Sequence, residues 1–307
     1  MQIMAEDDES SADQLTGLDD NDIKTNVYEG GFKSWECSID LVRFLLDRGP
    51  RKDLDDLARV DHVIEVSEFC SVSLNYFQIQ IIFSFEKVSY CGFGVNMNGS
   101  QMGCGTALPS LLLFHHALKS QLPLYLTLTD YNASVLRLVT LPNLLLTFAS
   151  TLDATALPFS SDSPNPLLSS KTSGDLIIAP ALISAFKSAL VALPITLTLI
   201  SGSWTPVPRL LELIPSTQEM NTFIVASETI YSPKSMVSFT DAMVGLLGRV
   251  RSGKALVGAK RVYFGVGGSV DGFREEVGER GAVAYEVEFE GLEEGGVRRC
   301  VLEVQMC

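Results

Sequence analysis

Hydrophobic positions along this chain change repeatedly between two patterns. Short apolar runs that predict buried strands occur at Val60–Glu65, Leu122–Thr129, Ile195–Ile200 and Thr222–Ala226. Segments with helical spacing of apolar residues lie at Ser38–Leu46, Leu108–Lys119, Ala133–Val139 and Met236–Arg251. Strands that alternate with helices predict an open α/β sheet with helices on both faces.

The C-terminal part of the chain departs from that alternation. We predict a strand at Arg261–Gly268, a helix at Asp271–Val277, and then an antiparallel hairpin. The hairpin pairs Val283–Glu290 with Arg298–Gln305 across the glycine-rich turn between them. A terminal hairpin of this kind distinguishes the predicted sheet from a plain dinucleotide-binding fold.

The first predicted helix, Ser38–Leu46, is amphipathic. Its apolar face is predicted to consist of Ile39, Val42, Leu45 and Leu46, with Ser38 as the N-cap. Trp35 and Glu36, just before it, either cover the core or line the rim of a ligand pocket.

One long apolar stretch, Leu176–Ile200, has 25 residues and a single charge, Lys187. Pro180 and Pro194 divide it, whereas a membrane span needs about 20 uninterrupted apolar residues. We therefore expect a buried helix followed by a buried strand, and no membrane association.

Composition narrows the class of protein. The 307 residues, 46% hydrophobic, fit a disordered acidic leader at 1–23 followed by one domain at 24–307, with a flexible Ser/Thr/Pro-rich loop at 150–174. The net charge of −14 argues against direct nucleic-acid binding and favours a basic protein partner. Six cysteines without a C-x-x-C motif fit a reducing compartment, which points to the cytoplasm and the nucleus.

A glycine-rich turn precedes the helix Leu108–Lys119. Gly103 and Gly105 are followed by Ala107, which fits a strand-to-helix turn that lets a ligand approach the backbone. Asp130 follows the second strand, 25 residues after Gly105, where α/β nucleotide sites hold ribose hydroxyls.

The segment Val66–Gln101 separates the first strand from that turn. Its 36 residues contain 7 of the 26 aromatic residues, only three charges and no proline. Removing it joins Glu65 directly to Met102 and restores a continuous strand-and-glycine-turn motif. We interpret it as a translated, unspliced intron that keeps the reading frame, and the alternative is a genuine long loop.

Other strand ends carry residues suited to binding. Trp204 follows the strand Ile195–Ile200 and suits either a flat ring such as adenine or an ordinary turn. Glu228 and Tyr231 follow the fourth strand, and their carboxylate and phenol could bind a polar side chain of a substrate. His115 and His116 lie on an apolar helix without partners at metal spacing, so we expect no metal site.

Several of these motifs occur together in one order along the chain, and this set resembles the eukaryotic histidine protein methyltransferases. The motifs lie at Tyr28–Ser38, Gly103–Pro109, Asp130–Asn132, Thr140–Asn143, Ser227–Tyr231 and Tyr263–Gly268. The resemblance implies a Rossmann-like seven-strand sheet dependent on S-adenosyl-L-methionine (SAM), and methyl transfer to a histidine of a large-subunit ribosomal protein. We expect the protein to be a monomer.

The resemblance further implies roles for individual residues. SAM would contact Trp35, Glu65, Gly103, Gly105, Asp130, Asn132 and Trp204, while Glu228 and Tyr231 would face the target side chain. Three positions depart from the family pattern: Ala107 replaces the third glycine, Ser203 replaces an aspartate, and the insert interrupts the motif.

Alternative functions stay open at this point. A lysine methyltransferase of the same fold would carry similar loops, and a catalytically silent protein would result if the insert displaced the SAM turn. An NAD-dependent oxidoreductase ranks last, since the third glycine of Gly-x-Gly-x-x-Gly is missing.

Overall fold

The structure of this protein is a computed structural model that describes residues 34–47, 60–66, 104–168, 175–289, 292 and 298–307. It also describes the backbone of three short strand segments at 23–24, 28–29 and 77–80. The predictions for the acidic leader at 1–22, for Gly103 and for most of the insert lie outside these residues.

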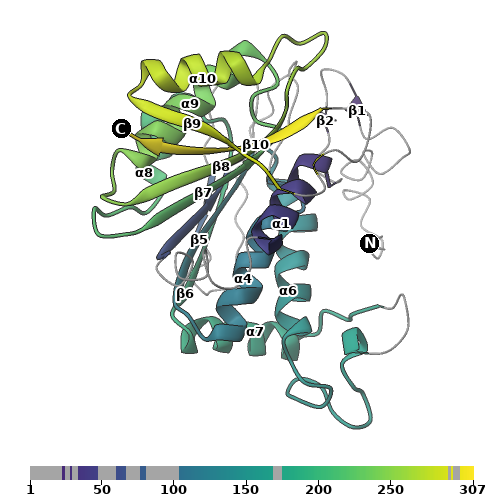
Figure 1. Cartoon of the computed structure of the whole chain (residues 1–307). Helices are drawn as coiled ribbons and strands as arrows, with labels where there is room; N and C mark the ends of the chain where they lie inside the picture. Colours follow the sequence, from purple (N-terminus) through teal and green to yellow (C-terminus); the bar gives the residue numbers. More distant parts are fainter. Residues whose placement is uncertain are drawn as a thin grey trace.

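The centre of the molecule is a twisted sheet of eight strands in the order β4-β6-β5-β3-β7-β8-β10-β9 (Figure 1). The strands β6, β5, β3, β7 and β8 run parallel, and β10 runs antiparallel to both β8 and β9. Their bounds are β3 His62–Glu65, β4 Phe77–Gln80, β5 Leu124–Asp130, β6 Ile195–Ser201, β7 Thr222–Ser227, β8 Gly253–Lys260, β9 Ala282–Val287 and β10 Arg299–Met306. The predicted C-terminal hairpin is confirmed, with Val283 opposite Gln305. A separate pair is formed by β1, Ile23–Lys24, and β2, Tyr28–Glu29.

The eighth strand comes from the insert. β4 pairs antiparallel with β6, with Phe77 opposite Ser201, and so extends the sheet at the edge beyond β6. Without β4, seven strands remain in the main sheet, the number that the resemblance implies. The insert therefore adds to the edge of the sheet and leaves the pairing of its central strands in place.

Helices cover both faces of the sheet, as predicted (Figure 1). One face carries α1 Glu36–Asp47, α4 Leu108–Ser120, α6 Leu141–Ser150 and α7 Pro180–Ala192. The other face carries α8 Val207–Leu213, α9 Pro233–Leu247 and α10 Val270–Glu279. Each face has its own hydrophobic core, because central parallel strands bury side chains on both sides.

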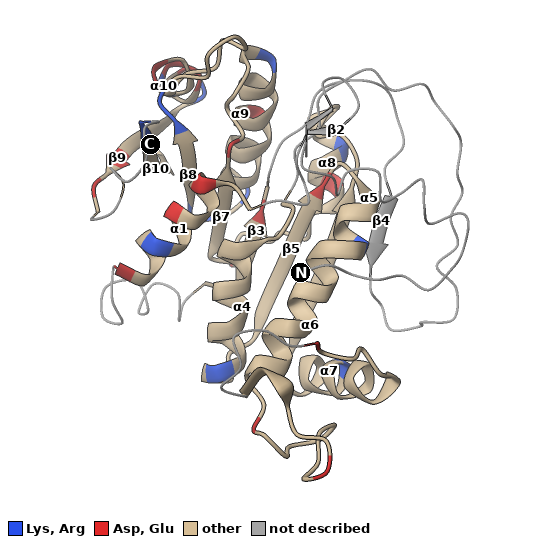
Figure 2. Cartoon of the chain, turned by 90° about the vertical axis from the view of Figure 1, so that its right-hand side faces the viewer, with Lys and Arg blue, Asp and Glu red and all other residues tan. Residues whose placement is uncertain are grey.

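The apolar segment Ala133–Ser150 is one nearly continuous helix. It begins as α5, Ala133–Val135, passes through a π-helical turn at Leu136–Thr140, and continues as α6. By length and composition alone it could cross a membrane, but Leu144 and Phe148 pack into the core. Figure 2 shows α6 without charged residues, in contrast to α1 and α10. The other apolar stretch forms α7 followed by β6, as the two prolines predict.

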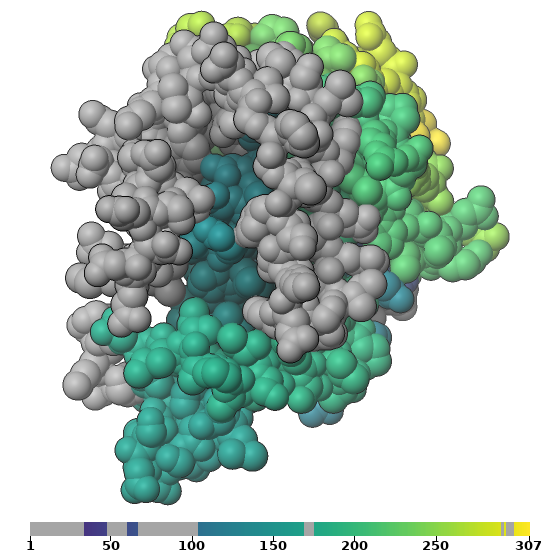
Figure 3. Space-filling view, turned by 180° about the vertical axis from the view of Figure 1, so that it is seen from behind, coloured from purple at the N-terminus to yellow at the C-terminus, as the bar shows by residue number. Residues whose placement is uncertain are grey.

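Residues 151–168, which the composition assigns to a flexible loop, have a defined backbone. They form turns that end in a short 3-10 helix at Pro166–Leu168 and make up the lobe at the lower left of Figure 3. Asn165 is buried, and its amide donates hydrogen bonds to the carbonyls of Ala149 (2.8 Å) and Leu152 (3.1 Å). These bonds tie the lobe to the end of α6.

The predicted strand at Arg261–Gly268 is wrong. The fifth parallel strand is β8, Gly253–Lys260, and residues 261–268 form a loop after it. Gly265 and Gly267 have φ of 83° and 88°, which no strand residue adopts. The loop closes back on the preceding turn, since the N–H of Gly268 donates to the carbonyl of Tyr231 at 2.9 Å. A Cβ on Gly268 would collide with the backbone of Ile230 and Tyr231, so glycine is required there.

The predicted buried face of α1 is wrong in part: Leu45 packs against the core, but Ile39 and Leu46 do not. The helix begins at Glu36, and the hydroxyl of Ser38 donates to the carbonyl of Trp35 (2.8 Å) instead of capping the helix. Its buried residues are Cys37, Ser38, Asp40, Leu41 and Phe44, whereas Ile39 and Leu46 are exposed. A charged residue lies on the buried face because it has a buried partner on β10.

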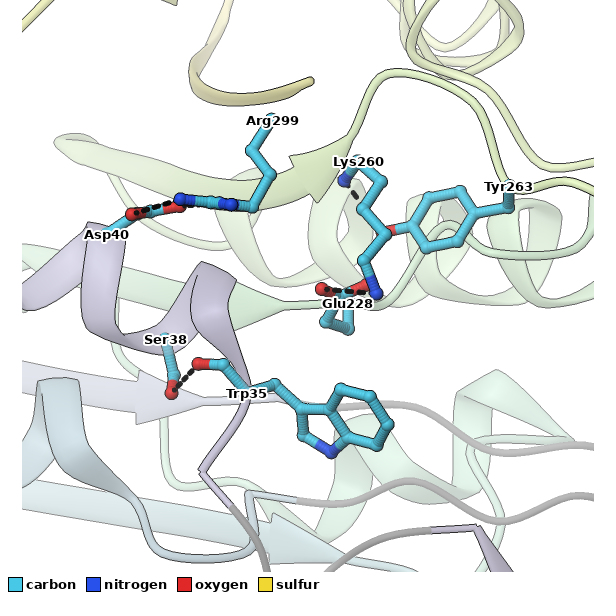
Figure 4. Close-up of polar contacts among 7 residues, drawn as sticks. All are labelled: Trp35, Ser38, Asp40, Glu228, Lys260, Tyr263 and Arg299. Carbon is cyan, nitrogen blue, oxygen red and sulfur yellow. Dashed lines mark hydrogen bonds and ion pairs between the residues drawn. The ribbon is translucent and has the colours of Figure 1, made fainter. Parts of the chain in front are cut away.

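That partner is Arg299, and the two side chains form an ion pair (Figure 4). The guanidinium Nε of Arg299 lies 2.5 Å from Oδ2 of Asp40, and its Nη2 lies 3.4 Å from Oδ1. Asp40 is 2% exposed and Arg299 is 8% exposed, so water screens the pair little. The pair fixes α1 to the last strand of the chain.

Removing one member of this pair will destabilise the protein strongly. Asp40→Asn or Arg299→Met leaves the other group buried without its partner, at a cost of about 3 to 5 kcal/mol in the free energy of unfolding. Arg209→Met is the matched control, because Arg209 pairs with Glu212 at 2.8 Å on an exposed helix surface. For Arg209→Met we expect the free energy of unfolding, measured with urea, to fall by less than about 1 kcal/mol. Equal losses at both sites would show that burial gives the Asp40–Arg299 pair no special importance.

Candidate active site

The glycine turn is anchored at the carboxyl end of the parallel strands. The N–H of Gly105 donates to Oδ2 of Asp130 at 3.1 Å, and the N–H of Asn132 donates to Oδ1 at 2.9 Å. Asn132 in turn caps α5, since its side-chain oxygen accepts from the N–H of Ser134 at 2.9 Å. The structure thus brings together three of the predicted SAM-binding residues: Gly105, Asp130 and Asn132.

Two further side chains hold the same turn and were not singled out from the sequence. Thr140 donates its hydroxyl to the carbonyl of Gly105 at 2.7 Å, and Asn143 donates its amide to the carbonyl of Thr106 at 3.1 Å. Thr140 ends the π-helical turn, a feature often found at functional sites. Their signal in the sequence was the motif Thr140–Asn143, which carried no assigned role.

Glu65 connects the two sides of the insert. It is the last residue of β3, and its Oε2 accepts a hydrogen bond from the N–H of Ser110 in α4 at 3.1 Å. Ala107, between the turn and that helix, has a φ of 55°, in the left-handed region that costs a non-glycine residue about 1 to 2 kcal/mol. Despite this cost, residues 104–110 stay attached to β3 and β5 across the 36-residue insertion.

Burial dominates the electrostatics of both carboxylates. It raises the pKa of Glu65 to about 7 and that of Asp130 to about 7, although N–H donors to each act in the opposite direction. Negative charge at Asp130 and Glu65 also helps raise the pKa of the buried Cys104 thiol. Two carboxyl groups that titrate near neutral pH therefore hold the glycine turn and the start of α4.

A second cluster surrounds Glu228, at the end of β7. Glu228 is 2% exposed and has a φ of 57°, so its backbone is strained in the way that often marks functional positions. Its N–H donates to the carbonyl of Gly258 on β8 at 2.9 Å, and its Oε1 lies 3.4 Å from Nζ of Lys260. By geometry, neither carboxylate oxygen accepts a hydrogen bond from the described residues, but the Cys37 thiol and the Tyr263 hydroxyl lie close enough to Glu228 for hydrogen-bond interactions that help raise their pKa values.

Aromatic residues lie around that ion pair (Figure 4). Nζ of Lys260 is 5.2 Å from the ring centroid of Trp35 and 5.9 Å from that of Tyr263. The rings of Tyr263 and Tyr231 pack edge to face, with their centroids 6.5 Å apart. Burial first, and the charge of Glu228 second, raise the pKa of both the Tyr263 hydroxyl and the Cys37 thiol. Trp35, Glu228 and Tyr231, all predicted site residues, thus belong to one cluster.

Sequence reasoning did not assign Lys260 or Tyr263 to the site. Tyr263 fell within the motif Tyr263–Gly268, which was assigned to a strand, and Lys260 lies just before that segment. Their position became visible only once β8 was found to end at Lys260.

Trp204 lies deeper than predicted. It is 3% exposed, and its indole packs on the ring of Phe239 with centroids 5.6 Å apart. Ser203 accepts a hydrogen bond from the N–H of Thr205 at 3.1 Å, so it caps a local turn. The N–H of Gly202 donates to the carbonyl of Asp130 at 3.0 Å, which joins this turn to the first cluster. The proposed contact of Trp204 with adenine stays a prediction.

Strand order and site together define the class of protein. Five parallel strands, an antiparallel strand inserted next to the last of them, and an outer strand paired to it form the sheet of the seven-strand methyltransferases. The glycine turn and Asp130 follow the first and second strands of that sheet, where such folds bind a nucleoside.

Sequence similarity leads to a particular group within this class. The chain is 34% identical over 288 residues to histidine protein methyltransferase 1 of Saccharomyces cerevisiae, covering 89% of this chain and 64% of that protein. It is 31% identical over 272 residues to histidine protein methyltransferase 1 of Schizosaccharomyces pombe, covering 88% and 63%. The resemblance to histidine protein methyltransferases is thus confirmed, although the chain spans less than two thirds of either relative.

Family models and solved structures say less about this chain than its sequence relatives do. No protein-family model matches the chain. A solved glycopeptide N-methyltransferase in complex with sinefungin aligns over 98% of both chains at 9% identity, with a TM-score of 0.42. The fold class therefore rests on the observed strand order.

The raised pKa of Asp130 predicts how stability depends on pH. Between its ordinary value of 3.8 and about 7, the folded protein keeps a proton on Asp130 that the unfolded chain has lost. The free energy of unfolding should then fall as the pH rises through that range, by about 4 kcal/mol at most from this group. Glu65, whose pKa rises from 4.5 to about 7, acts in the same direction.

The variant Asp130→Asn removes this titration. Its free energy of unfolding should therefore increase relative to that of the wild type between pH 4 and pH 7. Urea unfolding at several pH values measures the difference. A difference that stays constant with pH would contradict the assignment.

Proposed function

We propose that this chain is a SAM-dependent protein-histidine N-methyltransferase that acts on a large-subunit ribosomal protein. The observation that carries the proposal is Glu228, a buried carboxylate 3.4 Å from Lys260, whose ammonium lies near the rings of Trp35 and Tyr263. The similarity to two proteins named histidine protein methyltransferase 1 supports the same activity. The net charge of −14 supports a basic protein as the partner.

The residues of the first cluster fit SAM. Asp130 stands at the end of β5, where its remaining lone pairs would accept ribose hydroxyls, and Gly105 lets a ligand approach the backbone. Asn132, together with the half-buried Trp35 of the second cluster, would complete the contacts. When bound, SAM supplies a methyl group on a sulfonium centre that a nitrogen nucleophile can attack.

The residues of the second cluster would prepare the histidine. An imidazole with a pKa near 6.5 is mostly neutral at pH 7, so one nitrogen offers a lone pair to form the new N–C bond. The other nitrogen carries a hydrogen, and the buried carboxylate of Glu228 would accept a hydrogen bond from it. Such a bond fixes the ring tautomer and its direction, and positioning supplies most of the acceleration. The proton on that nitrogen would then pass to the carboxylate of Glu228.

We place this activity in the cytoplasm and the nucleus and propose that the protein acts as a monomer. The buried cysteines Cys37, Cys104 and Cys300 are free thiols, which supports a reducing compartment.

The insert should not prevent SAM binding, because the glycine turn stays bonded to Asp130 in its presence. We expect calorimetry to detect SAM binding both by the full chain and by a variant that lacks residues 66–101. Asp130→Ala should weaken binding by about tenfold or more in both forms, since one lost charged hydrogen bond costs about 1.5 to 3 kcal/mol. Binding only by the shortened form would show that this insert-containing chain is silent. Binding by neither form would reject the SAM site.

Methyl transfer is tested on large-subunit ribosomal proteins from an S. cerevisiae strain that lacks its own histidine protein methyltransferase 1. We expect incorporation of labelled methyl into histidine, located by mass spectrometry. Glu228→Gln, which keeps an acceptor oxygen but removes the charge, should lower kcat by roughly 10- to 100-fold. Unchanged turnover would remove Glu228 from the mechanism, and methylation of lysine instead would reject the histidine assignment.

A further inference from the structure

Lys260 occupies the position next to Glu228 that a cationic substrate would need. Lys260 ends β8 and Glu228 follows β7, so the two side chains meet at the carboxyl edge of neighbouring parallel strands. Their charged atoms are 3.4 Å apart, and the side chains are 22% and 2% exposed. Glu228 is therefore neutralised by a cation that belongs to the protein itself.

The ammonium group is held in this place from several directions (Figure 4). The rings of Trp35 and Tyr263 lie within 5.9 Å of it, a distance at which aromatic faces attract a cation. The backbone N–H of Lys260 donates to the hydroxyl of Tyr263 at 3.1 Å, which fixes the start of the side chain. Trp35 is positioned by α1, which the ion pair of Asp40 and Arg299 binds to β10. The two rings and Glu228 form a cation site already filled by Lys260.

We propose that Lys260 is the specificity-determining residue by which this site accepts histidine and rejects lysine. The inference rests on the proposed function and names the substrate class of the same site. A neutral imidazole can donate its N–H to Glu228 while Lys260 stays in place. A lysine ammonium would meet the Lys260 charge at close range in a poorly solvated site, where Glu228 is already paired.

The size of the discrimination follows from the neutral fraction of each side chain. With a pKa near 10.4, roughly one lysine in 2,500 is neutral at pH 7, whereas about three quarters of histidine side chains with a pKa near 6.5 are neutral. If only neutral side chains enter, histidine is favoured by a factor on the order of a thousand. Without Lys260, the ammonium form could pair with Glu228 and pass a proton to that carboxylate, which frees the nitrogen lone pair for attack, and this factor would fall.

The chain contains a matched control on the same strand. Lys254 is also 22% exposed, lies 3.8 Å from Glu303, and has its ammonium 5.9 Å from the ring centroid of Phe223. It lies near the opposite end of β8, away from Glu228. Lys254→Met therefore removes a similar pair of contacts and should leave the site unchanged.

The experiment uses two peptides that differ only at the methylated position, which is histidine in one and lysine in the other. Both peptides have the sequence that surrounds the methylated histidine identified in the ribosomal-protein assay. The kcat/KM values are measured for the wild type and for Lys260→Met, Lys260→Gln, Lys260→Arg and Lys254→Met. Lys260→Gln guards against misfolding, because its amide can still donate to Glu228 but carries no charge.

We expect Lys260→Met and Lys260→Gln to shift the preference towards lysine by at least about tenfold, mainly through a lower KM for the lysine peptide. Lys260→Arg and Lys254→Met should keep the wild-type preference. For the wild type, the rate with the lysine peptide should rise about tenfold per pH unit between about pH 7 and pH 9, as the neutral amine becomes more abundant. A merely structural role for Lys260 would not move these ratios.

The outcomes separate the two proposals. If the wild type methylates histidine and both neutral variants keep its preference, the role of Lys260 is overturned while the proposed function stands. If the wild type methylates no histidine, both proposals are overturned.

Discussion

The buried ion pair between Asp40 and Arg299 is the interaction on which the arrangement of the site depends. It joins the first helix to the last strand, across 259 residues of sequence. Because both groups are desolvated, each needs the other, and neither can leave without a large electrostatic cost. The pair therefore fixes α1, and α1 presents Trp35 to Lys260. The ion pair between Asp40 and Arg299, two residues distant in sequence from Glu228, thus helps to position the cluster around Glu228.

Buried carboxylates are stabilised in two different ways at the carboxyl edge of the sheet. Asp130 and Glu65 accept hydrogen bonds from backbone N–H groups, and burial still raises the pKa of each to about 7. Glu228 has a cation beside it, and its oxygens lack hydrogen bonds from the described residues. Asp130 holds the backbone of the glycine turn and Glu65 holds the start of α4, whereas Glu228 lies 3.4 Å from the ammonium of Lys260. One edge of the sheet thus holds two carboxylates bonded to backbone N–H groups and a third paired with a lysine.

Errors in the predicted elements have identifiable causes. β8, Gly253–Lys260, contains two glycines and two alanines, so its propensity for a strand is weak and neighbouring strands β7 and β10 determine it. The Tyr263–Gly268 segment contains strong strand formers, but its glycines adopt positive φ and turn the chain back towards Tyr231. On α1, the pattern favoured Ile39 and Leu46, because a sequence pattern gives no sign that Asp40 has a buried partner.

The sequence by itself determined the α/β class, the terminal hairpin, the glycine turn and the acids at the strand ends. These features depend on local periodicity and on residue types at short spacing, which a single chain displays directly. Only the tertiary structure decided that Thr140 and Asn143 hold the turn and that Lys260 faces Glu228. It also decided that the insert adds an edge strand beside β6 while the turn stays attached to Asp130 and Glu65. Such contacts join residues distant in sequence, and their energy comes from burial and charge pairing that exist only once the sheet has formed.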